Sequence, residues 1–427
     1  MLDIALLRKK FTFVKEQINK RYKEYAGLNR FHEVDSKWRD LTTKIQKLNS
    51  QRNDLSDQIS ILMSKKMFDE ANKIKSDVHG IKQTINTLEK ERTQIDDELL
   101  QILFSIPNIP HESVIVGKDE KDNKLIRSWG TPKKFNFSPM SHWDLAEKLG
   151  LVDFGRAVKL SGSRFTIYCD LGAKLIRALQ SFTLDINTKA GYKEMLPPVI
   201  LNPETLYGTG QLPKFEEDLF KLTNGKFLSP TAEVQLTSYY ANEIIKQTSL
   251  PLWLTANTAC FRSEAGSAGK DTKGVIRQHQ FYKTEMVKIV EPQNSYKELE
   301  TMVKQAESIL KALKLPYRVI MLCTGDMGFA AAKTYDIEVW LPSYGAYKEI
   351  SSCSNCEAYQ ARNLKMRYRD NKGDNLVFPH TLNGSGLAID RLWAAVIENY
   401  QQADGSVRIP TKLHKYFDGV KKIKYAM

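Results

Sequence analysis

The sequence contains few cysteines and no long apolar segment. Five cysteines among 427 residues are too few and too scattered for a disulfide framework, so we expect a reducing compartment. No run of about 18 apolar residues is present, which excludes a membrane-spanning helix. The first residues hold an apolar patch too short for a signal peptide, and Asp3 and Glu16 interrupt the acid-poor pattern typical of a mitochondrial presequence. We therefore expect a cytoplasmic protein.

Acidic residues are outnumbered by basic ones. The chain has 63 Lys and Arg against 50 Asp and Glu, which gives a formal net charge of +13. This balance favours a polyanionic partner, with nucleic acid as the first candidate, although a generally basic proteome would produce the same charge. The length is sufficient for one large domain and a smaller one.

Two segments in the first quarter of the chain have apolar residues at helical heptad spacing. The first series is Trp38, Leu41, Ile45, Leu48, Leu55, Ile59 and Leu62, and the second is Ile74, Val78, Ile81, Ile85, Leu88, Ile95, Leu99 and Ile102. Between them, the segment from Ser64 to Asp69 is the plausible turn, so the spacing predicts an antiparallel helical hairpin. Each helix should span about 30 residues and about 40 to 50 Å.

This arm has two interpretations. Charges of both signs cover its other faces, as in a structural coiled coil or a dimerising rod. Alternatively, its Lys and Arg side chains could meet the phosphates of an elongated partner. Pro107 and Pro110 end the second helix, and the polar run after Gly117 indicates a linker. We expect domains at residues 1–110 and 111–427.

The stretch from Cys260 to Ile289 predicts a long-looped β-hairpin. Residues two apart on a strand share a face, which places Arg262 with Glu264 on the first strand and Phe281 with Glu285 on the second. Arginine grips phosphate oxygens, an aromatic ring can stack on a purine, and carboxylates accept from amines. Such a surface suits a nucleotide beside an amino acid, although an ordinary cross-strand Arg–Glu pair would have the same pattern.

Three further segments contain polar residues near element ends. Thr231 precedes a helical run and is a plausible N-cap. Two strands should meet at a turn over residues 343–345, and Cys353 and Cys356 on the second form a lone C-x-x-C without a second ligand pair, so we expect no structural zinc. Near the end of the chain, a strand containing Gly384 and Gly386 leads into a helix that carries Arg391. Small residues at this place let the backbone approach a ligand, and a helix N-terminus favours phosphate.

Several of these phrases resemble the motifs of one enzyme class. FRSE, a glycine-rich loop and RQHQF resemble motif 2 of the class II aminoacyl-tRNA synthetases, and FRSEAGSAG is similar to the seryl-tRNA synthetase family of bacterial type. The helix over residues 172–189 and the strand ending at Pro198 resemble motif 1, which implies a homodimer. The turn TLNGSGLAIDR resembles motif 3, with one departure: Asp390 stands where the family usually has glycine. We expect this carboxylate to point away from Arg391, because neighbours on a helix project about 100° apart.

The resemblance implies the fold, the substrates and the site residues. The fold would be α+β, with an N-terminal antiparallel two-helix coiled-coil arm that grips tRNA, followed by a catalytic domain with a mixed, mostly antiparallel sheet flanked by helices. ATP would contact Arg262, Ser263, Glu264, Phe281, Glu349, Ile350, Ser351, Ser352 and Arg391. Serine would contact Thr231, Ala232, Glu233, Arg262, Glu285, Asn383 and Ser385. Arg262 and Arg391 would be catalytic, and Glu349 with Ser352 would hold Mg²⁺ through the ATP phosphates.

The implied reaction is activation of L-serine by ATP to seryl-adenylate, followed by transfer to tRNA(Ser); charging of tRNA(Sec) is left open. Two rivals also remain open. One is a paralogue that loads an amino acid onto a carrier protein, which would have no use for a tRNA-reading arm. The other is an inactive synthetase domain in a coiled-coil interaction protein. The intact motif residues argue against this alternative.

Overall fold

A computed structural model describes residues 1–265, 273–370 and 375–425. Two compact units are present: Glu24–Ile106 forms one, and Met1–Lys23 together with Pro107–Met427 forms the other. The division into domains at residue 110 stays a prediction. Within the described ranges, no helix has the length and apolarity needed to cross a membrane.

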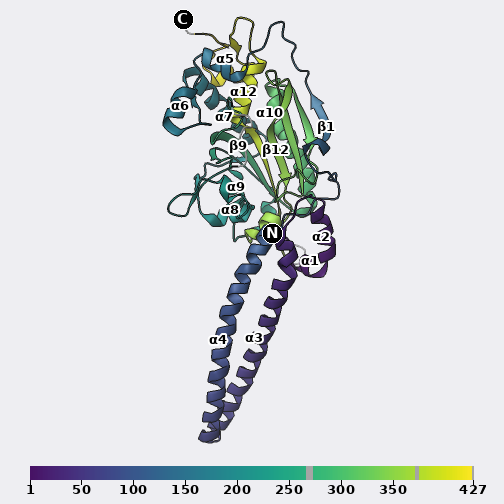
Figure 1. Cartoon of the computed structure of the whole chain (residues 1–427), viewed down its shortest axis with the longest axis vertical. Helices are drawn as coiled ribbons and strands as arrows, with labels where there is room; N and C mark the ends of the chain where they lie inside the picture. Colours follow the sequence, from purple (N-terminus) through teal and green to yellow (C-terminus); the bar gives the residue numbers. More distant parts are fainter. Residues whose placement is uncertain (266–272, 371–374, 426–427) are drawn as a thin grey trace. The chain divides into compact units, whose positions relative to one another are not determined.

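The smaller unit is a pair of long helices that pack side by side (Figure 1), α3 over Ala26–Ser64 and α4 over Phe68–Ser105. The predicted hairpin is therefore confirmed, but its helices have 39 and 38 residues rather than about 30. At 1.5 Å per residue, α3 is about 58 Å long. The prediction was too short because buried Leu28, Phe31 and Val34 continue the apolar stripe before Trp38.

The larger unit is built on an eight-stranded sheet. Its strand order is β1-β10-β11-β12-β15-β9-β8-β4, and every neighbouring pair is antiparallel except β4 with β8. The strands are β1 Lys124–Trp129, β4 Lys193–Glu194, β8 Leu252–Phe261, β9 Gln280–Val290, β10 Tyr317–Met321, β11 Lys333–Leu341, β12 Ala346–Asn355 and β15 His380–Ala388. The mixed, mostly antiparallel sheet is as expected.

Helices cover the sheet and contribute a large part of the core. Three of them, α7 Asp170–Lys189, α10 Ser295–Ala312 and α12 Ile389–Asn399, share one large buried cluster with the strands. The shorter helices are α1 Ile4–Lys9, α2 Phe11–Asn19, α5 His142–Lys148, α6 Phe154–Ser161, α8 Pro203–Thr209, α9 Glu233–Ser238 and α11 Tyr359–Asn363. Small sheets involve β2 Val152–Asp153, β3 Ile167–Tyr168, β5 Ile200–Leu201, β6 Phe227–Leu228, β7 Ile244–Lys246, β13 Arg367–Arg369, β14 Leu376–Val377, β16 Val407–Arg408 and β17 Lys422–Ile423.

The polar run after Gly117 is not a simple linker, as the sequence had indicated. It contains β1, which pairs with β10 at the edge of the main sheet. Five of the six residues of β1 are exposed, so the alternation that would reveal a half-buried strand is missing. The expected turn before β12 is confirmed, because β11 and β12 are joined at residues 342–345.

The sheet opens between β12 and β15. These strands pair at only three positions, Cys353–Asn355 with 382–384, and then separate. A register shift between Ser385 and Ala388 also bends β15 relative to β9. The separation leaves room between the strands at the level of Glu349 and Arg391, where the pocket described below is found.

The two glycines of β15 are required by packing in the core. A Cβ atom at Gly384 would lie 2.7 Å from Cys353 Sγ and 2.9 Å from Met302 Sδ. At Gly386 it would lie 2.9 Å from Asn187 Nδ2. The sequence had attributed these glycines to close approach of a ligand, whereas their neighbours are side chains of the protein itself.

Gly384→Ala should therefore lower the free energy of unfolding by about 1–3 kcal/mol, because the added methyl group overpacks the core. Gly155→Ala is the matched control, since its Cβ would meet only an ordinary contact at 3.7 Å in the exposed helix α6, and it should change stability by less than about 0.5 kcal/mol. Denaturant unfolding measures both. Equal stability of the two variants would contradict this account.

Candidate active site

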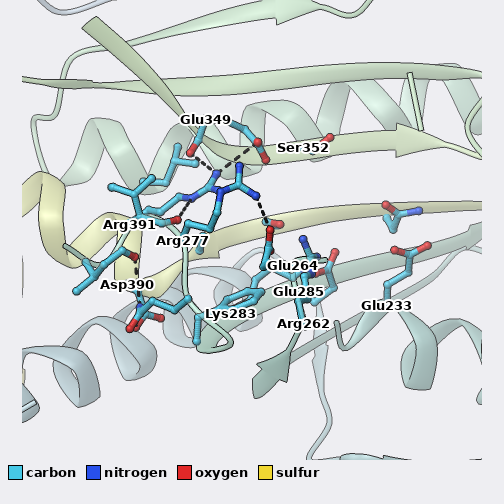
Figure 2. A pocket seen from close by; sticks show the side chains of 18 residues that line it. Glu233, Arg262, Glu264, Arg277, Lys283, Glu285, Glu349, Ser352, Asp390 and Arg391 are labelled. Carbon is cyan, nitrogen blue, oxygen red and sulfur yellow. Dashed lines mark hydrogen bonds and ion pairs between the residues drawn. The ribbon is translucent and has the colours of Figure 1, made fainter. Parts of the chain in front are cut away.

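A pocket of about 260 Å³ lies where β12 and β15 separate (Figure 2). It is lined by Glu233, Arg262, Glu264, Val275, Ile276, Arg277, Gln278, Phe281, Lys283, Glu285, Glu349, Ile350, Ser352, Asn383, Ser385, Ala388, Asp390 and Arg391. Arg391 and Asp390 lie at one end, and Glu233 lies at the other (Figure 2). The pocket thus has a guanidinium-rich end and an acidic end.

Arg262 lies over the ring of Phe281. The guanidinium carbon is 5.3 Å from the ring centroid, and Nε donates to the Pro230 carbonyl oxygen at 3.3 Å. Strand β8 ends at Phe261, so Arg262 and Glu264 are not on the strand as predicted, and Glu264 has a left-handed backbone with φ of 53°. Both side chains line the pocket nevertheless.

A second guanidinium, that of Arg391, lies at the end of the pocket opposite Glu233 (Figure 2). Arg391 donates from Nη1 to the Glu349 carbonyl oxygen at 2.7 Å and forms an ion pair with the Glu349 carboxylate at 3.3 Å. The Glu349 side chain is 49% exposed. Its partial desolvation in the pocket opposes ionisation, but the charges of Arg391 and Arg262 outweigh this and hold the pKa of the carboxyl below its ordinary value. Arg277 pairs with Glu264 beside them (Figure 2).

The acidic end contains two carboxylates in different surroundings. Glu285 is buried, forms an ion pair with Lys283 and accepts from the Thr231 hydroxyl at 3.0 Å. Glu233 accepts from the amide of Gln360 at 2.8 Å. Burial and the neighbouring charge of Glu285 raise the pKa of Glu233 to about 7.

Asp390 is buried at the start of α12 and does not pair with its neighbour Arg391. Its carboxylate accepts hydrogen bonds from the Tyr168 hydroxyl at 2.5 Å, the Gln278 amide at 3.0 Å and the Tyr282 backbone N–H at 2.6 Å. Both oxygens of the Asp390 carboxylate therefore accept hydrogen bonds from groups of the protein other than Arg391. This agrees with the expectation that it points away from the guanidinium.

Oxygen donors near Glu349 fit a Mg²⁺ ion that arrives with phosphates. Among the described residues, no three His, Cys, Asp or Glu side chains form a group that could hold a metal. The Glu349 carboxylate and the Ser352 hydroxyl line the pocket, and Asp336 behind them has a buried carboxylate oxygen without a hydrogen-bond partner. Burial and the charge of Glu349 raise the pKa of Asp336 well above its ordinary value. One or two carboxylates plus phosphate oxygens and water are the usual surroundings of Mg²⁺.

Four predicted residues do not have side chains in this pocket. Ser263 donates to the Glu217 carbonyl oxygen, and buried Ser351 donates to the Ser385 carbonyl oxygen at 2.6 Å. Ala232 belongs to a buried apolar cluster and is itself the N-cap of α9, one residue later than predicted. Thr231 still accepts from the Glu233 N–H at 3.1 Å, in addition to its bond to Glu285.

The sequence reasoning overlooked Lys283, Arg277 and Gln278. Lys283 shares a strand face with Phe281 and Glu285, so the two-residue period could have identified it. Arg277 and Gln278 open the RQHQF phrase that carried the resemblance, but their positions between loop and strand gave no periodic signal. The remaining predicted site residues are brought together here, while their roles stay predictions.

Comparison with known proteins identifies the class and then the family. Residues 215–400 match the family model of the tRNA synthetase class II core domain (G, H, P, S and T), and residues 1–110 match that of the seryl-tRNA synthetase N-terminal domain. The fold and the matched core are those of a class II aminoacyl-tRNA synthetase.

Similar proteins and solved structures narrow the assignment from the class to one family. A serine--tRNA ligase of Ureaplasma urealyticum is 54% identical over 97% of this chain and 100% of its own length. A seryl-tRNA synthetase of Pyrococcus horikoshii, solved with ATP, superimposes with a TM-score of 0.92 at 36% identity over all of both chains. A cytoplasmic serine-tRNA ligase of Naegleria fowleri, solved with AMP, gives 0.86 at 28% identity over 100% and 99% of the two chains. The chain belongs to the seryl-tRNA synthetase family.

Lys283→Met should lower the free energy of unfolding by about 3–5 kcal/mol, because it leaves the Glu285 carboxylate buried without its cation. Adding Glu285→Gln removes that charge and should restore most of the stability. Lys415→Met breaks an exposed pair with Asp185 and should cost less than about 1 kcal/mol. Urea unfolding measures all three, and additive losses in the double variant would contradict the buried pair.

Proposed function

We propose that this protein activates L-serine with ATP to seryl-adenylate and transfers the seryl group to tRNA(Ser). The observation that carries the proposal is the Arg262 guanidinium over the Phe281 ring, inside a pocket whose far end is acidic. Family membership and the ATP and AMP complexes of related enzymes support it. The reaction class is that of an aminoacyl-tRNA ligase.

In the first step, a carboxylate oxygen of serine attacks the α-phosphorus of ATP and the bond to pyrophosphate breaks. No protein nucleophile is needed, so the work of the site is alignment and neutralisation of charge. Arg262 bridges the serine carboxylate and the α-phosphate, while Phe281 stacks on adenine and Glu264 accepts from its amine. Arg391, at the end of the pocket opposite Glu233, holds the pyrophosphate portion, which leaves with the two electrons of the broken bond.

Glu349 and Ser352 would hold Mg²⁺ together with the phosphates of ATP. A bound ion would supply positive charge that stabilises the pyrophosphate leaving group. The pair of Glu349 with Arg391 supports the assignment, because it places a cation and a hard oxygen donor next to each other. Ile350 also lines the pocket.

Serine occupies the acidic end. Glu233 receives the ammonium group, and Glu285 accepts from the hydroxyl, with Asn383 and Ser385 closing the pocket. The bonds from Lys283 and Thr231 fix the Glu285 carboxylate, which is what discrimination by a hydrogen bond requires. A site built for a substrate hydroxyl rejects an analogue lacking it by about 10⁴ to 10⁵, so alanine would be excluded without editing.

The helical pair α3–α4 grips the tRNA, and two chains form a homodimer. The match of residues 1–110 to the seryl-tRNA synthetase N-terminal domain supports the first assignment. The net charge of +13 lies outside this pair, because residues 26–105 hold 13 Lys and Arg against 13 Asp and Glu. Exposed apolar side chains around motif 1 support the second, since Leu160 and Leu196 are 74% and 94% exposed in the single chain. Charging of tRNA(Sec) stays open, and a cytoplasmic location stays a prediction from cysteine usage.

The proposal is tested by pyrophosphate exchange with each of the twenty amino acids, followed by charging of a tRNA with a long variable arm. Exchange should require serine, and the seryl group should be recovered on the tRNA. Serine-dependent exchange without charging of tRNA would favour a carrier-loading enzyme. Absence of exchange with every amino acid would favour an inactive domain and overturn the proposal.

Arg262→Ala should reduce serine-dependent exchange by about 10²–10³-fold, because the charge that bridges the reacting groups is lost. Arg318→Ala is the matched control: its guanidinium also lies over a ring, 5.1 Å from Tyr347, but on β10 and outside the pocket lining. It should change the exchange rate by less than about twofold. Similar rates for Arg262→Ala and the control would refute the role of Arg262.

Serine use should depend on the ionisation of Glu233. Because its pKa is about 7, the carboxyl is protonated below this pH and cannot pair with an ammonium group, whereas it is ionised above. The ratio kcat/KM for serine should therefore rise with pH through about 7 and approach a tenfold change per pH unit on the acid side. Glu233→Gln should lower the ratio and remove this step. A step of equal size in both enzymes would exclude Glu233 as its source.

A further inference from the structure

The chain from Val275 to Tyr282 returns from the motif 2 loop into β9 and forms one wall of the pocket. It carries Arg277 and Phe281, and residues 273 and 274 separate it from the undescribed segment 266–272. Only part of this wall, from Gln280 onward, is held by strand pairing. The preceding residues need other contacts to stay in place.

Two neighbouring residues of α12 supply contacts at three points of this wall. Arg391 donates from Nε to the Ile276 carbonyl oxygen at 3.2 Å. Asp390 accepts from the Gln278 side-chain amide at 3.0 Å and from the Tyr282 N–H at 2.6 Å. Tyr282, which donates the last of these bonds, directly follows Phe281 in the chain.

A fourth point is held from α5. The Val275 N–H donates to His142 Nε2 at 3.1 Å, while the other nitrogen of this buried ring bonds to Glu398 at 2.7 Å. Because Nε2 accepts, Nδ1 carries the proton that is donated to the Glu398 carboxylate. This anchor fixes only the start of the wall.

Asp390 also reaches the strand before motif 1. The Tyr168 hydroxyl donates to Oδ1 at 2.5 Å, the same oxygen that accepts from Gln278. The ring of Tyr168 packs edge-on against Trp393 of α12, with 5.3 Å between the ring centroids. This packing fixes the Tyr168 hydroxyl next to the Asp390 carboxylate. One buried carboxylate of motif 3 thus contacts both the segment after the motif 2 loop and the strand that precedes motif 1.

We propose that Asp390 is a positioning residue for ATP: it holds the wall that carries Phe281 in register with Arg391. This inference rests on the proposed function, because the ring and the guanidinium matter as a pair only if a nucleotide occupies the space between them. Asp390 acts through Tyr282 and Gln278 and does not itself touch the substrate. The aspartate that replaces the usual glycine of motif 3 therefore helps to position the wall of this pocket.

Asparagine cannot replace this carboxylate. Three donors converge on its two oxygens, and an amide offers only one oxygen acceptor. If the amide oxygen accepts from the Tyr282 N–H, its NH₂ group meets the Gln278 NH₂ group; in the opposite orientation it meets the Tyr282 N–H. Either way one donor is left buried without an acceptor.

The test compares Asp390→Asn with Glu307→Gln. Glu307 is a buried carboxylate on α10 that also accepts from a tyrosine hydroxyl, that of Tyr317 at 2.8 Å, but it is absent from the pocket lining. Serine-dependent pyrophosphate exchange gives KM for ATP and for serine, and calorimetry gives ATP binding without turnover. Thermal unfolding shows how far each variant is destabilised.

For Asp390→Asn we expect KM for ATP to rise about tenfold, with a parallel loss of ATP affinity, and KM for serine to change by less than about twofold. The serine end is spared because Glu233 and Glu285 have their own partners. Glu307→Gln should lose stability but keep both constants within about twofold. Unchanged ATP constants in Asp390→Asn, or equal changes for ATP and serine, would overturn the proposal.

Tyr168→Phe provides a milder variant should Asp390→Asn not fold. It removes one of the three donors and keeps the ring against Trp393. KM for ATP should rise by about two- to fivefold, and in combination with Asp390→Asn the effects should be less than additive. A Tyr168→Phe enzyme with wild-type KM for ATP would overturn the proposal. Failure here is distinct from failure of the proposed function, which would appear as absence of serine-dependent exchange in the unmodified protein.

Discussion

The pocket depends on two strand pairings of unequal length. β8 and β9 pair at ten positions without interruption, whereas β12 and β15 pair at only three. The long pairing makes a rigid hairpin that presents Phe281 and Glu285 on one face. The short pairing lets the neighbouring strands separate, so that this face is open in the region where charged side chains gather. A sheet paired throughout its length would have no space for a substrate here.

Burial of charge in this space imposes a second constraint, because an ionised carboxylate away from water needs a partner. Of the carboxylates largely removed from water, Glu264 has Arg277 and Glu285 has Lys283, and half-exposed Glu349 also pairs with Arg391. In the part of the chain that the structure describes, the carboxyl of Glu233 accepts only from the Gln360 amide. Burial and the charge of Glu285 raise its pKa to about 7. Of these four glutamates, Glu233 is thus the one without an ion-pair partner among the described residues.

Much of this arrangement could be predicted from the sequence. Some parts followed from the spacing of residues, and others followed only from the resemblance to known motifs. Heptad spacing predicted the helical pair, and the two-residue period predicted that Phe281 and Glu285 share a face. The same period placed Arg262 on a strand that ends one residue earlier, so its position in the pocket depended on resemblance to motif 2. β1 could not be predicted, because an exposed edge strand lacks the alternation that burial imposes. Periodicity reports which face is buried, and it is silent where an element is exposed or where a turn directs the side chain.

The contacts of Asp390 show a further limit of this kind. Its three donors come from positions 168, 278 and 282, and only the fold brings them to the start of α12. In the sequence, the carboxylate next to Arg391 could be judged only against that neighbour, with which it does not pair. A buried acid is stable in such a place only if several donors converge on it, so its presence implies the convergence but not the identity of the donors. The wall from Val275 to Tyr282 is therefore set by long-range hydrogen bonds, and local propensity alone would leave it undetermined.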